Sequence, residues 1–226
     1  MTLSQKKRYS NTVGISYTYN EPTVWYEFVS ECAQLGKSHG LCNVLVTNGY
    51  IAKEPLSDLL PFVDALNVDV KAWDDDFYRR MVGGRLAPVL ETVEQAYASG
   101  AWVEVTYLVI PGENDSDEDM KGLADWLSSI SPTIPLHLSR FFPAYQLDLP
   151  PTPLSSLERL REVARESLYY VYIGNAIKEG YGHTFCPNCG ELLLARSGLQ
   201  LRRSFLADGL CPTCGRALEF AGQVWV

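Results

Sequence analysis

Four cysteines near the C-terminus have the spacing of a metal site. They lie in the sequences "CPNCG" and "CPTCG" as Cys186, Cys189, Cys211 and Cys214. Two Cys-x-x-Cys pairs can converge on one tetrahedral ion through four thiolates. The glycine after each pair permits a left-handed turn that directs backbone N–H groups toward the sulfurs. We predict a structural Zn²⁺ site, with iron, a thiol redox pair or disulfides as the alternatives.

The sequence between the two pairs is typical of a zinc ribbon. Between Cys189 and Cys211 lie 21 residues, which include two short strand-like runs. The gap is slightly longer than the commonest range for such sites. Residues 181–226 contain four arginines against three acidic residues, which favours a structural or docking role over nucleic-acid binding. We predict a zinc ribbon over 181–226 and a separate domain over 1–180.

A second candidate for chemistry is the carboxylate in "SYTYNEPTVWYEF", residues 16–28. The segment starts like a strand and continues like a helix, and Asn20, Glu21 and Pro22 lie at the junction. Proline suits the first position of a helix, and an acid suits its cap or first turn. Glu21 therefore either starts a helix or holds a ligand.

Polar residues recur where other predicted strands end. Thr47 and Asn48 follow one apolar run, and Asp69 and Lys71 close another. Active sites of parallel α/β barrels lie at the carboxyl ends of the strands. Agreement among several strand ends favours a common site, although each residue alone could be a cap or a turn.

Strand-like and helical segments alternate along residues 13–173, which predicts an α/β fold with a parallel sheet. We expect a partial (β/α) barrel, with a doubly wound sheet as the alternative. The predicted strands are Val13–Tyr19, Asn43–Thr47, Leu66–Lys71, Trp102–Ile110, Leu136–Phe141 and Tyr169–Ile173. The predicted helices are 22–39, 53–63, 74–82, 88–99, 116–129 and 154–167.

Several predicted strands have one polar face. Glu104 and Thr106 share a face of one strand, and His137 and Ser139 share a face of another. Strands covered on both sides read instead as continuous apolar runs. The pattern predicts a cavity for a polar ligand, with an internal ion-pair network or a solvent-facing surface as the alternatives.

The first predicted helix has an apolar stripe at three- and four-residue spacing. Its members are Val24, Trp25, Phe28, Val29, Cys32 and Leu35. We interpret Cys32 as a core thiol and Cys42, which opens the next strand, in the same way.

The acidic segment "PGENDSDED", residues 111–119, resembles a metal loop but lacks the ligand spacing of a calcium site. We interpret it as a helix start, with Asp115 or Ser116 as the cap and acids in the first turn.

Composition excludes several classes of protein. The chain has 226 residues, 46% of them apolar, and a formal net charge of -8. An acidic balance argues against non-specific nucleic-acid binding. The sequence shows neither a transmembrane run nor a signal peptide, so we predict a cytoplasmic protein without membrane contacts.

Taken in order, several motifs resemble one family. These are "SYTYNEPTVWYE", "VTNGY", "LNVDVKAWDDDFYRRMVGG", "YLVIPGENDS", "LHLSRFFP" and the final CPxCG ribbon. They resemble the radical SAM proteins of the AmmeMemoRadiSam system, relatives of the pyruvate formate-lyase-activating enzymes. The resemblance implies a partial (β/α)6 barrel that binds S-adenosylmethionine beside a 4Fe–4S cluster and makes a 5′-deoxyadenosyl radical for hydrogen abstraction.

The resemblance also assigns residues to the cofactor. Asn20 and Glu21 stand where such enzymes hold the methionyl ammonium. Thr47 and Asn48 match a strand end near the cofactor. Asp69 and Lys71 match the strand at its methionyl end, where the lysine suits the carboxylate. It implies a protein substrate or family-system partner proteins.

The sequence departs from the family in two places. Val46 stands where activating enzymes tend to have an aspartate associated with a cation site. The cluster motif Cys-x3-Cys-x2-Cys, which normally precedes the "TYNEP" strand, does not occur. We therefore expect a barrel without its first strand that does not cleave the cofactor by itself, as a fragment, a mis-assigned start or a degenerate protein.

Two other functions are compatible with these residues. One is a non-catalytic scaffold that docks through the ribbon. The other is a metal-dependent hydrolase that uses Asp69 and Glu104, although the chain has only three histidines to serve as ligands.

Overall fold

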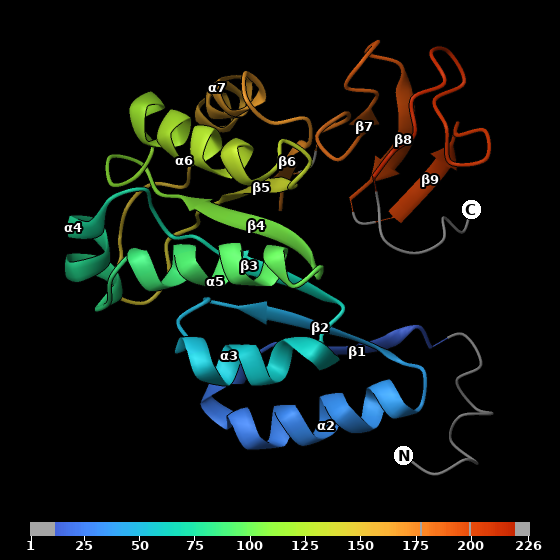
Figure 1. Ribbon diagram of the computed structural model, residues 1–226. Coiled ribbons are helices and arrows are strands. Elements are labelled where there is room, and N and C mark those ends of the chain that lie inside the picture. The colour runs from blue at the N-terminus through green and yellow to red at the C-terminus, as the bar shows by residue number, and fades with distance from the viewer. Residues whose placement is uncertain (1–11, 177, 199, 220–226) are drawn as a thin grey trace. The chain divides into compact units, whose positions relative to one another are not determined.

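A computed structural model of the protein describes residues 12–176, 178–198 and 200–219. Six strands form one sheet in sequence order (Figure 1). The pairs β1–β2, β2–β3, β4–β5 and β5–β6 are parallel. The strands are β1 Gly14–Tyr17, β2 Cys42–Thr47, β3 Ala65–Asp69, β4 Trp102–Val109, β5 Leu136–Arg140 and β6 Val171–Gly174. The predicted α/β fold and all six predicted strands are confirmed, while closure into a partial barrel stays a prediction.

Helical segments separate these strands, as predicted. They are η1 Pro22–Trp25, α2 Tyr26–Ser38, α3 Lys53–Leu59, η2 Leu60–Phe62, α4 Asp75–Phe77, η3 Tyr78–Val82, α5 Ala87–Ala98, α6 Asp117–Ile130 and α7 Leu154–Arg165. The first predicted helix is thus a 3₁₀ turn followed by an α-helix. Among the described residues, no helix is long and apolar enough to cross a membrane.

The chain divides into two compact units. The first contains residues up to Val68 together with Pro88–Val103, and the second contains Asp69–Ala87 together with the chain from Glu104 onward. In the first unit, α2 packs against β1 and β2. In the second, α6 and α7 lie side by side, and α7 covers β5 and β6 (Figure 1).

The strands of both units alternate between a buried and a half-buried face. In β4, Val105 and Tyr107 are completely buried, while Glu104 and Thr106 are only partly buried. This alternation follows from the two-residue period of a strand. It confirms the predicted polar face of the sheet.

The buried stripe of helix α2 shares only Val29 with the expected stripe. The buried residues are Val29, Ala33 and Gly36, whereas Phe28 and Leu35 are 58% and 53% exposed. Small residues bring the helix close to β2, since a Cβ on Gly36 would lie 2.8 Å from the Asn43 Oδ1 atom. The most apolar stripe is therefore not the packing face.

The interpretation of Cys32 and Cys42 as core thiols is also wrong. Cys32 is partly exposed because it lies beside the buried stripe of α2 and not on it. Cys42 is exposed because the strand alternation of β2 turns the neighbouring Asn43 inward instead. The buried Asn43 amide donates to the carbonyls of Ala33 and Phe62, each at 2.8 Å.

The C-terminal segment forms a small antiparallel sheet. Its strands are β7 Thr184–Phe185, β8 Leu192–Ser197 and β9 Gln200–Ser204, in that order. Strands β8 and β9 are the two runs expected between the cysteine pairs. Cys186, Leu193 and Cys211 form the buried centre of this segment.

Candidate functional site

Glu21 starts the first helical segment, as one of its two predicted roles requires. It has extended backbone dihedral angles and caps η1, where Pro22 occupies the first turn. The Thr23 N–H and hydroxyl groups donate to Glu21 Oε1 at 3.0 and 2.8 Å. A side-chain acceptor at this position satisfies a backbone donor that the helix leaves open.

The same carboxylate reaches the end of the neighbouring strand. The Thr47 hydroxyl donates to Glu21 Oε1 at 2.7 Å, and the Asn48 N–H donates to Oε2 at 2.6 Å. The Thr47 hydroxyl in turn accepts from the Gly49 N–H at 3.0 Å. Three predicted site residues therefore meet at one carboxylate, as parallel strand ends allow.

The distribution of donors leaves one carboxylate oxygen open to a ligand. Oε1 accepts three hydrogen bonds, whereas Oε2 accepts one. A carboxylate oxygen can accept more than one hydrogen bond, so Oε2 can take a further donor such as an ammonium. Asn20, also predicted here, is exposed. Sequence reasoning did not predict that Thr23 binds this carboxylate. The available signal was its position, two residues after an acid that caps a helix.

Asp69 and Lys71 form an ion pair in the second unit. Their side chains are each 30% exposed, and the Lys71 Nζ and Asp69 Oδ2 atoms lie 2.6 Å apart. The Lys71 backbone N–H donates to the Tyr78 hydroxyl at 2.9 Å. Burial raises the pKa of Tyr78 to about 12, so its phenol stays neutral at physiological pH.

Buried Asn114 is a second residue that sequence reasoning missed. Its amide nitrogen donates to the Lys71 and Leu108 carbonyls at 2.7 and 2.8 Å, and its oxygen accepts from the Ile110 N–H at 2.6 Å. It fixes the backbone at Lys71 against the end of β4. The sequence signal for this role was an asparagine shortly after the end of a strand. It lies within the acidic segment that we interpreted as a helix start.

That acidic segment does start a helix. The Ser116 hydroxyl accepts from the Asp119 N–H at 3.0 Å, which caps α6. Asp117, Glu118 and Asp119 occupy the first turn, where the helix dipole favours negative charge.

A second polar pair lies on the half-buried face of the second unit. His137 Nε2 and Glu104 Oε2 are 2.7 Å apart, and the His137 ring stacks on Tyr172 with the ring centres separated by 5.3 Å. Hydrogen bonding and stacking together orient the imidazole. This is the polar face that the sequence predicted, with an internal hydrogen-bonded pair on it.

The four C-terminal cysteines converge, as predicted. Their sulfur atoms all lie within 4.8 Å of one another, with 3.5 Å between Cys186 and Cys214 and 3.6 Å between Cys189 and Cys211. Tetrahedral Zn–S bonds of about 2.3 Å place two sulfurs roughly 3.8 Å apart, so the cluster fits one ion. Gly190 and Gly215, which follow the pairs, have the left-handed φ values of 76° and 73°.

Comparison with known proteins assigns this sequence to a family. Residues 3–126 match the Radical SAM superfamily. The chain belongs to that superfamily. The match covers more than half of the chain and includes Glu21, Thr47, Asp69 and Lys71.

Individual relatives in the superfamily include activating enzymes. The uncharacterized protein MJ0808 of Methanocaldococcus jannaschii is 48% identical over 214 residues, which are 92% of this chain and 63% of that protein. The benzylsuccinate synthase activating enzyme of Thauera aromatica is 28% identical over 55% of this chain and 38% of its own. The pyruvate formate-lyase 1-activating enzyme of Escherichia coli K12 is 27% identical over 50% of this chain and 47% of its own.

The chain thus spans less than two thirds of each of these relatives. Among solved structures, a domain of a pyruvate-formate lyase-activating enzyme from Bacteroides vulgatus superposes with a TM-score of 0.62 at 15% identity. The superposition covers 72% of this chain and 99% of that domain. It supports the radical SAM fold.

The residues of this chain fit the two cofactors of the superfamily unequally. The Glu21 carboxylate is held in one orientation and keeps acceptor capacity on Oε2, which suits an ammonium such as the one that S-adenosylmethionine carries. The cluster has no matching ligands, because none of the six cysteines of the sequence has the Cys-x3-Cys-x2-Cys spacing. Cys32 and Cys42 have nine residues between them, and the other four cysteines converge on the C-terminal centre.

Proposed function

We propose that this chain is the S-adenosylmethionine-binding core of a radical SAM protein related to the glycyl-radical activating enzymes, followed by a zinc ribbon. The observation that carries the proposal is the convergence of Thr23, Thr47 and Asn48 on the Glu21 carboxylate. Donors on both oxygens hold the carboxylate in one orientation before a ligand arrives. Such preorganisation reduces the ordering entropy that binding costs.

In this proposal Glu21 Oε2 accepts a hydrogen bond from the methionyl ammonium, a charge-assisted contact between oppositely charged groups. When bound beside a reduced cluster, the cofactor supplies a 5′-deoxyadenosyl radical for hydrogen abstraction. Asp69 and Lys71 are assigned to the same cofactor by the superfamily resemblance. Hydrogen bonds to Tyr78 and Asn114 hold the Lys71 backbone in place. A fixed backbone at Lys71 supports this assignment.

The cluster ligands have to come from residues other than those present here. We therefore propose that this chain alone binds S-adenosylmethionine without cleaving it. Membership of the AmmeMemoRadiSam system, with a protein substrate or partner proteins, remains part of the proposal and rests on the ordered motifs of the sequence.

The four-cysteine centre favours a second candidate function, a non-catalytic scaffold. In that case the ribbon docks a partner, and the Glu21 carboxylate only joins η1 to β2. The hydrolase hypothesis has no comparable support. A metal-dependent hydrolase needs a cluster of histidine, cysteine or acidic side chains that can hold an ion. Among the described residues, the four cysteines form the only such cluster.

Calorimetric titration with S-adenosylmethionine and with 5′-methylthioadenosine separates these functions, because the second ligand lacks the ammonium. We expect Glu21→Ala to weaken binding of S-adenosylmethionine at least about tenfold, as the loss of one charged hydrogen bond implies. Binding of 5′-methylthioadenosine should stay within about twofold.

Glu27→Gln, which removes an acid in the first turn of α2, serves as the matched control. Glu21→Gln keeps an oxygen acceptor for the cap and isolates the loss of charge. A wild-type chain that binds neither ligand would favour the scaffold.

A further inference from the structure

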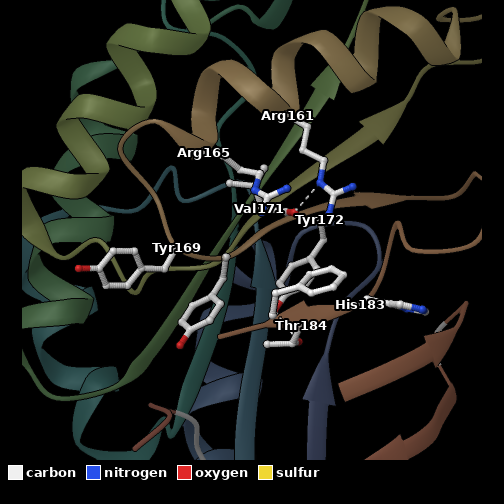
Figure 2. Close-up of a pocket in the computed structure, with 9 residues that line it drawn as sticks. Arg161, Arg165, Tyr169, Val171, Tyr172, His183 and Thr184 are labelled. Atoms are coloured by element: carbon white, nitrogen blue, oxygen red, sulfur yellow. Dashed lines mark hydrogen bonds between the residues drawn. The ribbon is translucent and has the colours of Figure 1, made fainter. Parts of the chain in front are cut away.

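A pocket in the second unit has a strongly basic lining. It is a partly open depression between the end of α7, the start of β6 and the strand β7, with about 230 Å³ of empty space when the adjoining open solvent is included. Arg161, Arg165, Tyr172, His183 and Thr184 are among its lining residues (Figure 2). No aspartate or glutamate is among the described residues that line it. None of these residues belongs to the proposed cofactor site.

The two arginines are one helical turn apart on α7, so their side chains share a face. Figure 2 shows both guanidinium groups directed toward the start of β6. Arg161 Nε donates to the Val171 carbonyl at 3.1 Å, which fixes the guanidinium plane and leaves its terminal nitrogens for other acceptors. Burial, and then the charge of Arg165, lower the pKa of Arg161. A guanidinium group keeps its positive charge at neutral pH in proteins.

No described carboxylate contacts the Arg161 guanidinium directly, although the charges of Glu158 and Glu162 act on it from nearby. In the described part of the chain Arg161 forms no ion pair, and its recorded polar contact is the bond to Val171. Each neighbouring acid faces another cation: Glu158 with Lys178, Glu162 with Arg165 and Glu219 with Arg216. The pocket therefore contains Arg161, which has no direct carboxylate partner, and Arg165, which Glu162 partly neutralises, in a chain whose net charge is -8.

The opposite wall of the pocket is held by a hydrogen-bonded chain. The Tyr172 hydroxyl lies 2.9 Å from the Thr184 hydroxyl oxygen, which also accepts from Arg196 Nη1 at 2.6 Å. The Arg196 guanidinium carbon stands 5.9 Å from the centre of the Tyr172 ring. A third guanidinium thus supports the wall from β8, and these contacts tie the ribbon to β6.

We propose that this pocket binds a phosphoryl group, as inorganic phosphate or as the phosphate of a monoester. Guanidinium groups donate paired hydrogen bonds that match the geometry of phosphate oxygens. A phosphoryl group presents more acceptor oxygens than a carboxylate does, which suits two guanidinium groups one turn apart. The site is independent of the proposed function, because it uses neither Glu21 nor the four cysteines.

Titration of the full chain with sodium phosphate in a non-phosphate buffer at constant ionic strength tests the site. Isothermal calorimetry should detect phosphate binding that chloride does not reproduce. Arg165→Ala should raise the Kd for phosphate about tenfold, and Arg161→Gln, which can still donate to Val171, should raise it by at least as much. Arg159→Ala, on the same helix and paired with Asp117, should leave the Kd within about twofold.

Three further measurements make the result decisive. Circular dichroism without phosphate checks that each variant is folded, and if Arg161→Gln is not, the exposed Arg165 still tests the site. Glycerol phosphate distinguishes the source of the group: tighter binding than inorganic phosphate indicates a monoester, and weaker binding indicates free phosphate. Acetate that binds as tightly as phosphate, or Arg165→Ala with wild-type affinity, overturns the proposal.

Discussion

Glu21 Oε2 accepts a 2.6 Å hydrogen bond from the backbone N–H of Asn48, which joins the start of η1 to the end of β2. The Thr47 hydroxyl adds a 2.7 Å bond to the other carboxylate oxygen. A helix cap and a strand end are thus organised by one side chain. Substitutions at the end of β2 should therefore change the orientation of the Glu21 carboxylate without removing it.

Thr47→Val should destabilise the protein by about 1–2 kcal/mol, because the buried hydroxyl bonds both Glu21 and the Gly49 N–H. If Glu21 holds the cofactor, the affinity for S-adenosylmethionine should also fall roughly three- to tenfold. Urea unfolding and calorimetry measure the two effects. Thr47→Ser keeps the hydroxyl and should restore most of both, and unchanged affinity in Thr47→Val would contradict a positioning role.

Asn114→Ala should destabilise the protein by about 3 kcal/mol or more. The substitution leaves the Ile110 N–H and the Lys71 and Leu108 carbonyls without their amide partner, and each unpaired buried group costs about 1–3 kcal/mol. Urea unfolding measures the change. Asn20→Ala is the matched control, since Asn20 is exposed and should change stability by less than about 0.5 kcal/mol.

The four-cysteine centre should hold one zinc ion per chain, measured by elemental analysis of purified protein. Because two of the thiols form the centre of a small core with Leu193, loss of the ion should unfold the ribbon. Cys211→Ser and treatment with a strong chelator should both lower its melting temperature. Cys32→Ser, at a partly exposed thiol outside the centre, should not alter the metal content. Zinc and iron both well below one equivalent would contradict this site.

The exposed apolar surface of the first unit should promote self-association. It includes Val24, Phe28 and Leu35, and in the described part of the chain β1 has β2 as its only strand partner. Unpaired strand edges and apolar patches both favour association. Analytical ultracentrifugation should show concentration-dependent assembly that Phe28→Glu reduces. Tyr145→Glu, at an exposed aromatic residue of the second unit, should not reduce it, and a monomer that melts cooperatively would contradict the prediction.

Much of the fold could be predicted because strand alternation is a local property. In β3 and the residues that follow it, Leu66, Val68 and Val70 are buried, while Asp69 and Lys71 are half-buried, as their positions indicate. The meeting of Thr47 and Asn48 with Glu21 was predictable for a related reason, since parallel strand ends gather at one edge of a sheet.

The remaining contacts were not predictable because they depend on the partner of each side chain. Asn114 is buried by three backbone partners that periodicity does not reveal. The Thr23 hydroxyl helps to orient the Glu21 carboxylate. The sequence pattern alone is equally compatible with a hydroxyl that faces solvent. In α2, apolar character selected the wrong stripe, because close packing on Asn43 depends on the small Ala33 and Gly36.

That packing face gives a last prediction. Gly36→Val should destabilise the protein by about 2 kcal/mol or more, because its Cβ would lie 2.8 Å from the Asn43 Oδ1 atom, and Asn43 also binds the Ala33 carbonyl and the Tyr17 hydroxyl. Leu35→Val, next to it on the exposed face, should change stability by less than about 0.5 kcal/mol. Thermal and urea unfolding measure both. If Leu35→Val were the more damaging substitution, the stripe predicted from apolar character would be the packing face after all.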